Sequence, residues 1–258
     1  LLLNLKKDDE VIVPSFSFIT TASSFARTGC KLRFCDIEQR NLMPSFNHIK
    51  KCINTRTKAI VIVHYQGFSV DYLDKLQAFC KKKKIILIED AAQSFGSYFK
   101  NKPLGSFGDL ACYSFYSNKI ITTGEGGMVV TNNFKYYKEL VYLKNLAFGK
   151  PRFLHQEAAY NFRLGSLQAA LGISQLNKVK GFIKKKRNLA NVYAKNLQGI
   201  KGIELPFYHE DYYNVYWMYG IQIKEEFGRS RDQLSKFLFK NRIETRTFFC
   251  PLNLQPFL

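Results

Sequence analysis

Long hydrophobic runs are missing from this sequence. Its longest uninterrupted apolar stretches, such as Ala59–Val63 and Ile85–Ile88, have the length of a β-strand, whereas a membrane-spanning helix needs about 20 apolar residues. The segment Leu1–Leu5 is too short for a signal peptide and lacks a basic start. Internal repeats and low-complexity segments are also missing. We therefore expect a globular chain with no membrane partner, and its 258 residues suffice for one large domain or two ordinary ones.

Cysteine and histidine are too scattered to suggest a metal site. The sequence has no C-x-x-C pair and no closely spaced pair of histidines, which argues against zinc, so we expect no bound metal. Several of the six cysteines lie in apolar runs, where a free thiol behaves as a small hydrophobic side chain. Free thiols fit a reducing compartment, and a cytoplasmic location is expected.

Acidic residues are scarce, because 20 Asp and Glu face 39 Lys and Arg, which gives a formal charge of +19. Such a charge is typical of nucleic-acid-binding proteins. The basic residues, however, form runs such as Lys81–Lys84 and Lys184–Arg187 on predicted helices, and no zinc-finger or RNA-binding signature accompanies them. We interpret the charge as solvated helix surface that can also attract an anionic substrate, and we expect no nucleic-acid partner.

Short apolar runs alternate with helix-length segments in the first half of the chain. Strands are predicted at residues 11–13, 31–35, 59–63, 85–88 and 109–115, and helical patterns at 19–27, 46–53 and 71–83 separate the first four. This alternation predicts an α/β fold with a mostly parallel sheet covered by helices. Right-handed crossovers place the carboxyl ends of the strands at one edge, where such sheets bind ligands.

The pattern changes in the second half. A glycine turn at 124–127 leads into a strand at 128–131, and helices are predicted at 135–146, 164–176 and 182–197. Leu164, Leu167 and Leu171 share one face of their helix. After about residue 199, aromatic strands at 214–223 and 243–249 flank a helix at 230–239. We therefore expect a large domain over residues 1–180 and a smaller α+β domain over 181–258.

Two chemically distinctive residues are predicted at the ligand edge of the sheet. Asp90 follows the strand at 85–88, and Lys119 follows the strand at 109–115. A pyridoxal phosphate (PLP) enzyme needs such a pair, because the lysine forms a Schiff base with the cofactor aldehyde and the aspartate keeps the pyridine nitrogen protonated. Spacing alone leaves open a capping aspartate and a solvated lysine.

Five strings, in chain order, carry a more specific signal. They are DEVIVPSFSF (9–18), IEDAAQS (88–94), SFYSNKIITTGEGGM (114–128), YNFRL (160–164) and IETRTFFCPL (243–252). Over nearly the whole chain they resemble the sugar-nucleotide aminotransferases of the DegT/StrS family, which are fold-type-I PLP enzymes. The NKIITTGEGG and ETRTFF segments are most similar to the perosamine synthases, which aminate GDP-4-keto-6-deoxymannose with glutamate as donor.

The resemblance implies roles for individual residues. Lys119 matches the Schiff-base lysine, which also moves a proton between substrate and cofactor, and Asp90 matches the partner of the pyridine nitrogen. Gln93 matches the side chain that contacts the phenolic oxygen. Phe18 matches the aromatic ring that stacks on the pyridine, and Ser114 a hydroxyl donor to the phosphate. The implied reaction is a ping-pong transamination in which L-glutamate leaves as 2-oxoglutarate and a nucleotide-linked keto sugar takes the amino group.

Partner and substrate predictions rest on other residues. Asn161 and Arg163 match a family segment that reaches the cofactor phosphate of the partner subunit, which implies a homodimer with shared active sites. Arg246 is a candidate for binding a diphosphate or a carboxylate. Glu125 is a candidate for the sugar pocket, with a plain hairpin turn as the alternative. Phe248 is a further substrate candidate, and ordinary core packing explains it equally well.

The resemblance also leaves alternatives. The family carries a phosphate-binding turn upstream of the string at 9–18 and continues beyond residue 258, so we expect a fragment of a longer aminotransferase. The enzyme could instead use a dTDP- or UDP-linked keto sugar, or be an inactive truncated relative. A related PLP-dependent sugar dehydratase carries histidine in place of the lysine, and Lys119 argues against it. The implied product is an amino sugar for surface polysaccharide, such as the O-antigen of lipopolysaccharide.

Overall fold

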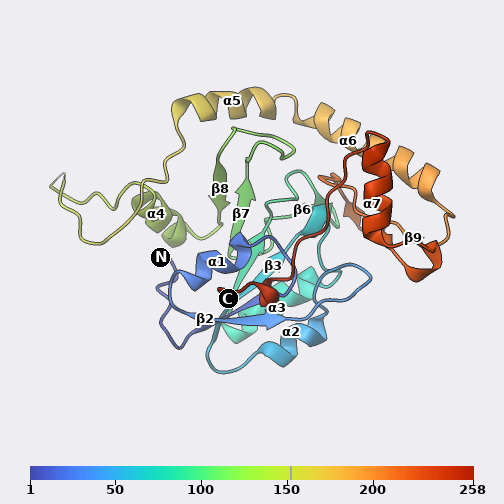
Figure 1. The fold of residues 1–258 in the computed structure, drawn as a ribbon. Helices are drawn as coiled ribbons and strands as arrows, with labels where there is room; N and C mark the ends of the chain where they lie inside the picture. Colours follow the sequence, from blue (N-terminus) through green and yellow to red (C-terminus); the bar gives the residue numbers. More distant parts are fainter. Residues whose placement is uncertain (152) are drawn as a thin grey trace.

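The computed structural model describes residues 1–151 and 153–258. Its centre is a six-stranded sheet with the order β2-β1-β3-β4-β7-β8 (Figure 1). These strands are β1 (Glu10–Pro14), β2 (Lys31–Cys35), β3 (Thr57–Val63), β4 (Ile86–Asp90), β7 (Leu110–Ser114) and β8 (Gly127–Val130). The first five are parallel, and β8 runs antiparallel to β7. The mostly parallel α/β sheet expected from the sequence is confirmed, with small shifts at the strand ends.

Alternating side chains of the strands form two apolar layers, one on each face of the sheet. On one face, Ile12 packs in a cluster that includes Ile49 of α2 (Phe46–Cys52) and Leu76 of α3 (Leu73–Lys83). On the other face, Val11 and Val13 pack with side chains from α1 (Thr20–Ala26) and α4 (Phe134–Leu143). Helices therefore cover both faces, which explains why the central strands are almost continuously hydrophobic.

The parallel strands bring several loops to one edge of the sheet. Val63 of β3 lies opposite Asp90 of β4, and Asp90 lies opposite Cys112 of β7. The loops that follow β3, β4 and β7 therefore begin at nearly the same level. The loop after β3 contains the 3₁₀ turn η1 (Tyr65–Gly67), and the loop after β7 contains Lys119. This is the edge at which ligands bind in parallel sheets.

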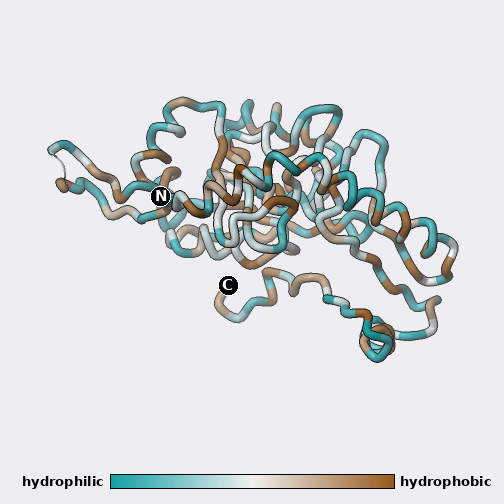
Figure 2. Tube along the Cα trace, turned by 90° about the horizontal axis from the view of Figure 1, so that it is seen from above, coloured by the Kyte–Doolittle hydropathy of each residue, from teal (hydrophilic) through white to brown (hydrophobic). Residues whose placement is uncertain are grey.

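Two helices and a projecting segment lie outside these layers. α5 (Ser166–Leu176) and α6 (Val179–Leu197) run along one side of the molecule in Figure 1. The chain between α4 and α5 extends away from the body in Figure 1 and Figure 2, and we call its described residues, 144–151 and 153–163, the arm. Backbone hydrogen bonds between residues 144–146 and 160–162 join the two ends of the arm. No residue of α5 is buried, and Leu167 is 87% exposed.

The C-terminal region consists of short strands, turns and one regular helix. The helix α7 (Arg231–Lys240) lies within one residue of the helix predicted at 230–239, and Ser230 before it forms a capping box with Gln233. The short elements are β9 (Ile203–Glu204) paired with β11 (Gln222–Ile223), β10 (Tyr212–Tyr213) paired with β5 (Tyr98–Phe99), β6 (Lys102–Pro103) beside β5, and the 3₁₀ turns η2 (Glu225–Phe227) and η3 (Leu252–Leu254). Because β10 pairs with β5, this region packs directly on the first part of the chain.

Two strand predictions for this region are wrong. Of residues 214–223, only the last two lie in a strand. The Asn214 side chain accepts the N–H of Tyr216, Ser97 Oγ accepts the N–H of Val215, and Tyr216 has a φ of 50°. These side-chain acceptors and the left-handed residue replace the partners of an extended ladder. Residues 243–249 lie in no strand, because no described segment pairs with them. Aromatic composition favours a strand only where a neighbour completes the sheet.

In the described part of the chain, no helix has the length and apolar character needed to cross a membrane. The described residues also contain no group of three or more His, Cys, Asp or Glu side chains arranged to hold a metal ion. All six cysteines are free thiols.

Candidate active site

Asp90 is the last residue of β4, and two hydrogen bonds hold its carboxylate at the sheet edge. Its Oδ2 atom accepts from the Thr21 hydroxyl at 2.6 Å, and its Oδ1 atom accepts from the N–H of Ala92 at 3.2 Å. Thr21 is buried in the first turn of α1, where its hydroxyl also lies 2.8 Å from Ser17 Oγ. A strand end and a helix start thus determine together where the carboxylate points.

Lys119 lies in the loop after β7, and the charge of Asp90 acts on its amine. Its backbone N–H donates to the carbonyl of Tyr116 at 3.0 Å, which closes a turn. Burial lowers the pKa of the Lys119 amine, and the negative charge of Asp90 partly opposes this shift. The Nζ atom lies 4.0 Å from the centre of the Trp217 ring. A lowered pKa increases the unprotonated fraction at neutral pH, which makes the amine a better nucleophile than an ordinary lysine.

A second carboxylate, Glu89, organises the loops around this pair. It points to the opposite face of the sheet from Asp90, because successive residues of a strand alternate. Glu89 is fully buried, accepts three backbone N–H groups of the loop 105–108 at 2.5 to 2.7 Å, and lies 2.7 Å from Nε2 of the fully buried His64. Burial alone would raise the pKa of Glu89, but the hydrogen bonds from His64 and the backbone lower it below the ordinary value. Glu89 thus ties the loop before β7 to the ends of β3 and β4.

A half-buried lysine and an oriented aspartate, which follow neighbouring strands to the carboxyl edge of a parallel sheet, form an arrangement that suits PLP chemistry. Comparison with known proteins agrees. The model of the DegT/DnrJ/EryC1/StrS aminotransferase family matches residues 1–258. The chain belongs to this family. It is a PLP-dependent sugar aminotransferase of the fold-type-I class, as the sequence predicts.

The relatives of this aminotransferase include enzymes named for one sugar. GDP-perosamine synthase from Vibrio cholerae is 37% identical over 256 residues, which are 98% of this chain and 69% of that protein. GDP-perosamine synthase from Escherichia coli O157:H7 is 35% identical over 257 residues, 99% of this chain and 69% of that protein. The predicted similarity to perosamine synthases is confirmed.

Solved structures show the same fold. The aminotransferase TlmJ from Streptoalloteichus hindustanus superposes with a TM-score of 0.93 at 27% identity, over 99% of this chain and 69% of TlmJ. Helicobacter pylori PseC, an aminotransferase involved in the biosynthesis of pseudoaminic acid, gives a TM-score of 0.90 at 28% identity, over 99% of this chain and 71% of PseC.

The side chains of this aminotransferase fit PLP. Lys119 offers an amine of lowered pKa for the cofactor aldehyde, and Asp90 offers a carboxylate whose direction is already determined. Gln93 is buried, and its Oε1 atom accepts the N–H of Gln66 at 2.8 Å. The group that Gln93 can offer is therefore its amide NH₂, which is the donor that a phenolic oxygen requires.

The other predicted cofactor residues, Phe18 and Ser114, lie just before α1 and at the end of β7. Phe18 lies at the start of α1, where its carbonyl accepts the N–H of Thr21 at 3.1 Å. Its ring is 50% exposed and lies 5.4 Å from the ring of Phe249, so it is not part of the sheet core. Ser114 is the last residue of β7, and its hydroxyl accepts the N–H of Tyr116 at 3.3 Å. Their contacts with the cofactor stay predictions.

Asn161 and Arg163 have no contact with Lys119 or Asp90 among the described residues. Both are exposed at the base of the arm, where Asn161 bridges to Asn145. Nε of Arg163 donates to Oδ1 of Asn161 at 2.8 Å, which orients the guanidinium group. The predicted role of both residues at a partner subunit stays a prediction.

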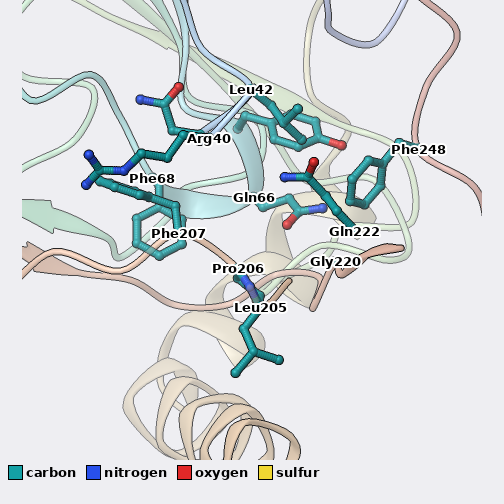
Figure 3. A pocket seen from close by; sticks show the side chains of 12 residues that line it. Arg40, Leu42, Gln66, Phe68, Leu205, Pro206, Phe207, Gly220, Gln222 and Phe248 are labelled. Carbon is teal, nitrogen blue, oxygen red and sulfur yellow. The ribbon is translucent and has the colours of Figure 1, made fainter. Parts of the chain in front are cut away.

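The three substrate candidates are dispersed. Phe248 lines a small pocket at the surface (Figure 3). Its neighbours there include Arg40, Gln66, Phe207 and Gly220. Glu125 and Arg246 are exposed and do not line this pocket. This pocket therefore groups Phe248 with neither of the other two candidates, and the substrate roles of all three stay predictions.

Sequence reasoning missed three residues that organise the site: Thr21, Glu89 and Trp217. Thr21 and Asp90 are 69 residues apart in the sequence, and Trp217 and Asn118 are 99 apart. No local sequence pattern therefore predicts either hydrogen bond. Glu89 did carry a signal, since a charged residue inside a buried apolar strand must find several partners.

Proposed function

We propose that this aminotransferase moves the amino group of L-glutamate to C4 of a nucleotide-linked 4-keto-6-deoxy sugar, with GDP as the nucleotide. The observation that carries the proposal is the placement of Lys119 and Asp90 after neighbouring strands at one sheet edge, in a chain 37% identical to a GDP-perosamine synthase. The product would be an amino sugar for a surface polysaccharide. The six free thiols support a cytoplasmic location for this step.

The proposed roles are those that the family resemblance implies, and the contacts of the site support them. Bound PLP supplies an electron sink for a carbanion at the reacting carbon. Lys119 Nζ anchors the cofactor aldehyde and, when free, carries a proton to or from the reacting carbon. The Asp90 carboxylate holds a proton on the pyridine nitrogen, and the Thr21 hydroxyl keeps that carboxylate in place. The NH₂ group of Gln93 donates to the phenolic oxygen, and the hydroxyl of Ser114 binds the phosphate.

A homodimer is part of the proposal. Leu167 and Leu171 of α5 are exposed, at 87% and 43%, whereas Leu164 of the predicted leucine face lies before the helix. On the arm, the stacked rings of Tyr160 and Phe162 lie 4.9 Å apart and are 54% and 69% exposed. Apolar surface of this kind favours burial against another protein surface. A second copy that covers it would place Asn161 and Arg163 beside a neighbouring active site.

The test is a substrate panel. Glutamate is supplied with GDP-, dTDP- or UDP-linked 4-keto-6-deoxy sugars, and release of 2-oxoglutarate is measured. We expect the GDP-linked sugar to give the highest kcat/KM, and Lys119→Ala to abolish release with every sugar while circular dichroism stays unchanged. Turnover by Lys119→Ala would exclude the assignment of the lysine.

The same panel decides between nucleotides. A dTDP-4-dehydro-2,3,6-trideoxy-D-glucose 4-aminotransferase from Saccharopolyspora spinosa is 30% identical over 276 aligned residues, which cover 99% of this chain. A higher kcat/KM with the dTDP- or UDP-linked sugar would show that the nucleotide is not GDP. The proposed transamination would still hold.

A further inference from the structure

Trp217 is the side chain against which the Lys119 amine rests. The Nζ atom of Lys119 lies 4.0 Å from the centre of the Trp217 ring. Trp217 is 6% exposed and is the only tryptophan in the chain. No ion pair joins Lys119 to a carboxylate in the described part of the chain, so the indole ring is the direct contact of the amine.

The indole ring is held in place on several sides. Its Nε1–H donates to the carbonyl of Asn118, the residue before Lys119, at 2.8 Å. Nζ of Lys186 on α6 donates to the Trp217 carbonyl at 3.1 Å. The ring packs in a buried cluster with Ile120 and Ile183. The ring plane is therefore oriented relative to the same loop that carries Lys119.

A ring face and a carboxylate stabilise an ammonium group in different ways. It attracts the cation through its quadrupole, but it cannot accept the proton. A carboxylate at the same place would pair with the ammonium and hold it strongly in the charged form. The ring therefore leaves the amine able to exchange its proton, while burial pulls the amine toward the neutral form.

We propose that Trp217 is a positioning residue that receives the Lys119 amine whenever this amine is not bonded to the cofactor. The ring holds Nζ in one place, so that proton transfer at the reacting carbon always starts from the same geometry. The inference rests on the proposed catalytic role of Lys119. Trp217, a residue of the C-terminal region, would then position the reactive lysine of the loop after β7.

The first test uses tryptophan fluorescence of the cofactor-free full chain, in which all tryptophan emission comes from Trp217. A pH titration should show a step in emission as the Lys119 ammonium loses its proton. Lys119→Met should remove that step, and Lys186→Met should keep it, because Lys186 contacts the backbone carbonyl and not the ring face. Identical titrations of wild type and Lys119→Met would overturn the contact.

The second test measures the amine itself by carbon-13 NMR after reductive methylation, with Lys119→Arg identifying the signal. Trp217→Leu keeps the site apolar but removes the ring face, so we expect the pKa of the amine to fall by about one unit, a tenfold loss of proton affinity. In Trp217→Phe, the amine pKa should lie between the values of wild type and Trp217→Leu. Tyr219→Leu is the matched control, because it removes a neighbouring aromatic ring that packs on Tyr193.

The outcomes separate this inference from the proposed function. An unchanged amine pKa in folded Trp217→Leu, with Lys119→Ala inactive, would overturn the role of Trp217 alone. Turnover by Lys119→Ala would overturn the catalytic assignment itself. Should Trp217→Leu fail to fold, the fluorescence titration and Trp217→Phe decide, because both retain an aromatic ring at this position.

Discussion

Replacing Glu89 by alanine should destabilise the sheet edge that carries the active site. The side chain is fully buried and accepts three backbone N–H groups of the loop 105–108. A buried donor that loses its acceptor costs about 1–3 kcal/mol. Water entering the vacated space would satisfy some of these groups, so we expect a loss of about 4 kcal/mol. Because domains are stable by only about 5–15 kcal/mol, this loss would bring the protein close to unfolding.

Urea denaturation measures the effect, with Glu89→Gln as the matched control. Glutamine keeps the shape and one acceptor oxygen but places an NH₂ group against N–H donors, so we expect a loss of about half that of alanine. Cofactor titration should show weaker PLP binding in Glu89→Ala, since the loop leading to β7 and Lys119 is no longer tied down. A free energy of unfolding for Glu89→Ala within about 1 kcal/mol of wild type would refute the reasoning, because one unmet buried donor already costs that much.

The pH dependence of stability gives an independent check on Glu89. Its pKa is lowered in the folded protein, through His64 and the backbone hydrogen bonds that outweigh burial. A carboxyl group of this kind contributes stability that is present above its unfolded pKa and is lost as pH falls through the folded pKa. Wild type should therefore lose stability on the acid side of the ordinary glutamate range. Glu89→Gln should lack this component of the acid loss.

Three further predictions concern the site and the assembly. Asp90→Asn should retain PLP but release 2-oxoglutarate at least about 100-fold more slowly; a wild-type rate would show that Asp90 does not hold the pyridine proton. Thr21→Val removes the hydroxyl that holds Asp90 at 2.6 Å, and we expect kcat to fall about tenfold, from a charged hydrogen bond worth about 1.5–3 kcal/mol. The kcat of Thr21→Ser should stay near that of wild type, because serine keeps the hydroxyl. Equal kcat values for Thr21→Val and Thr21→Ser would show that the Thr21 hydroxyl does not support Asp90. Leu167→Glu places a charge on the exposed face of α5 and should weaken the dimer in light scattering; an unchanged dimer would exclude α5 from the interface.

The sequence predicted the sheet better than the region that follows it. The strand Lys31–Cys35 has the bounds that its apolar pattern indicates, and Ile86–Asp90 differs by a small shift. Both lie in a layered core where hydrophobic pattern and burial agree. The expected strands at 214–223 and 243–249 failed because aromatic residues there pack by side-chain contacts, without a neighbouring strand over most of their length.

For the candidate site, the sequence by itself determined the chemistry that is available. Lys119 and Asp90 each follow a recognisable buried strand, and parallel strands must end at a common edge. Their motifs also determined the family, since those strings occur in order along the chain.

Only the tertiary structure decided which residues orient Asp90 and Lys119 and how the pKa of Lys119 shifts. Thr21, Glu89 and Trp217 reach their partners from distant positions, through hydrogen bonds and a ring face that no local pattern encodes. The lowered pKa of Lys119 arises from burial and from the charge of Asp90, and both depend on which segments pack together. Residue types set the possible reactions, whereas packing sets the proton affinities and directions of the groups, because desolvation and distance exist only in the folded chain.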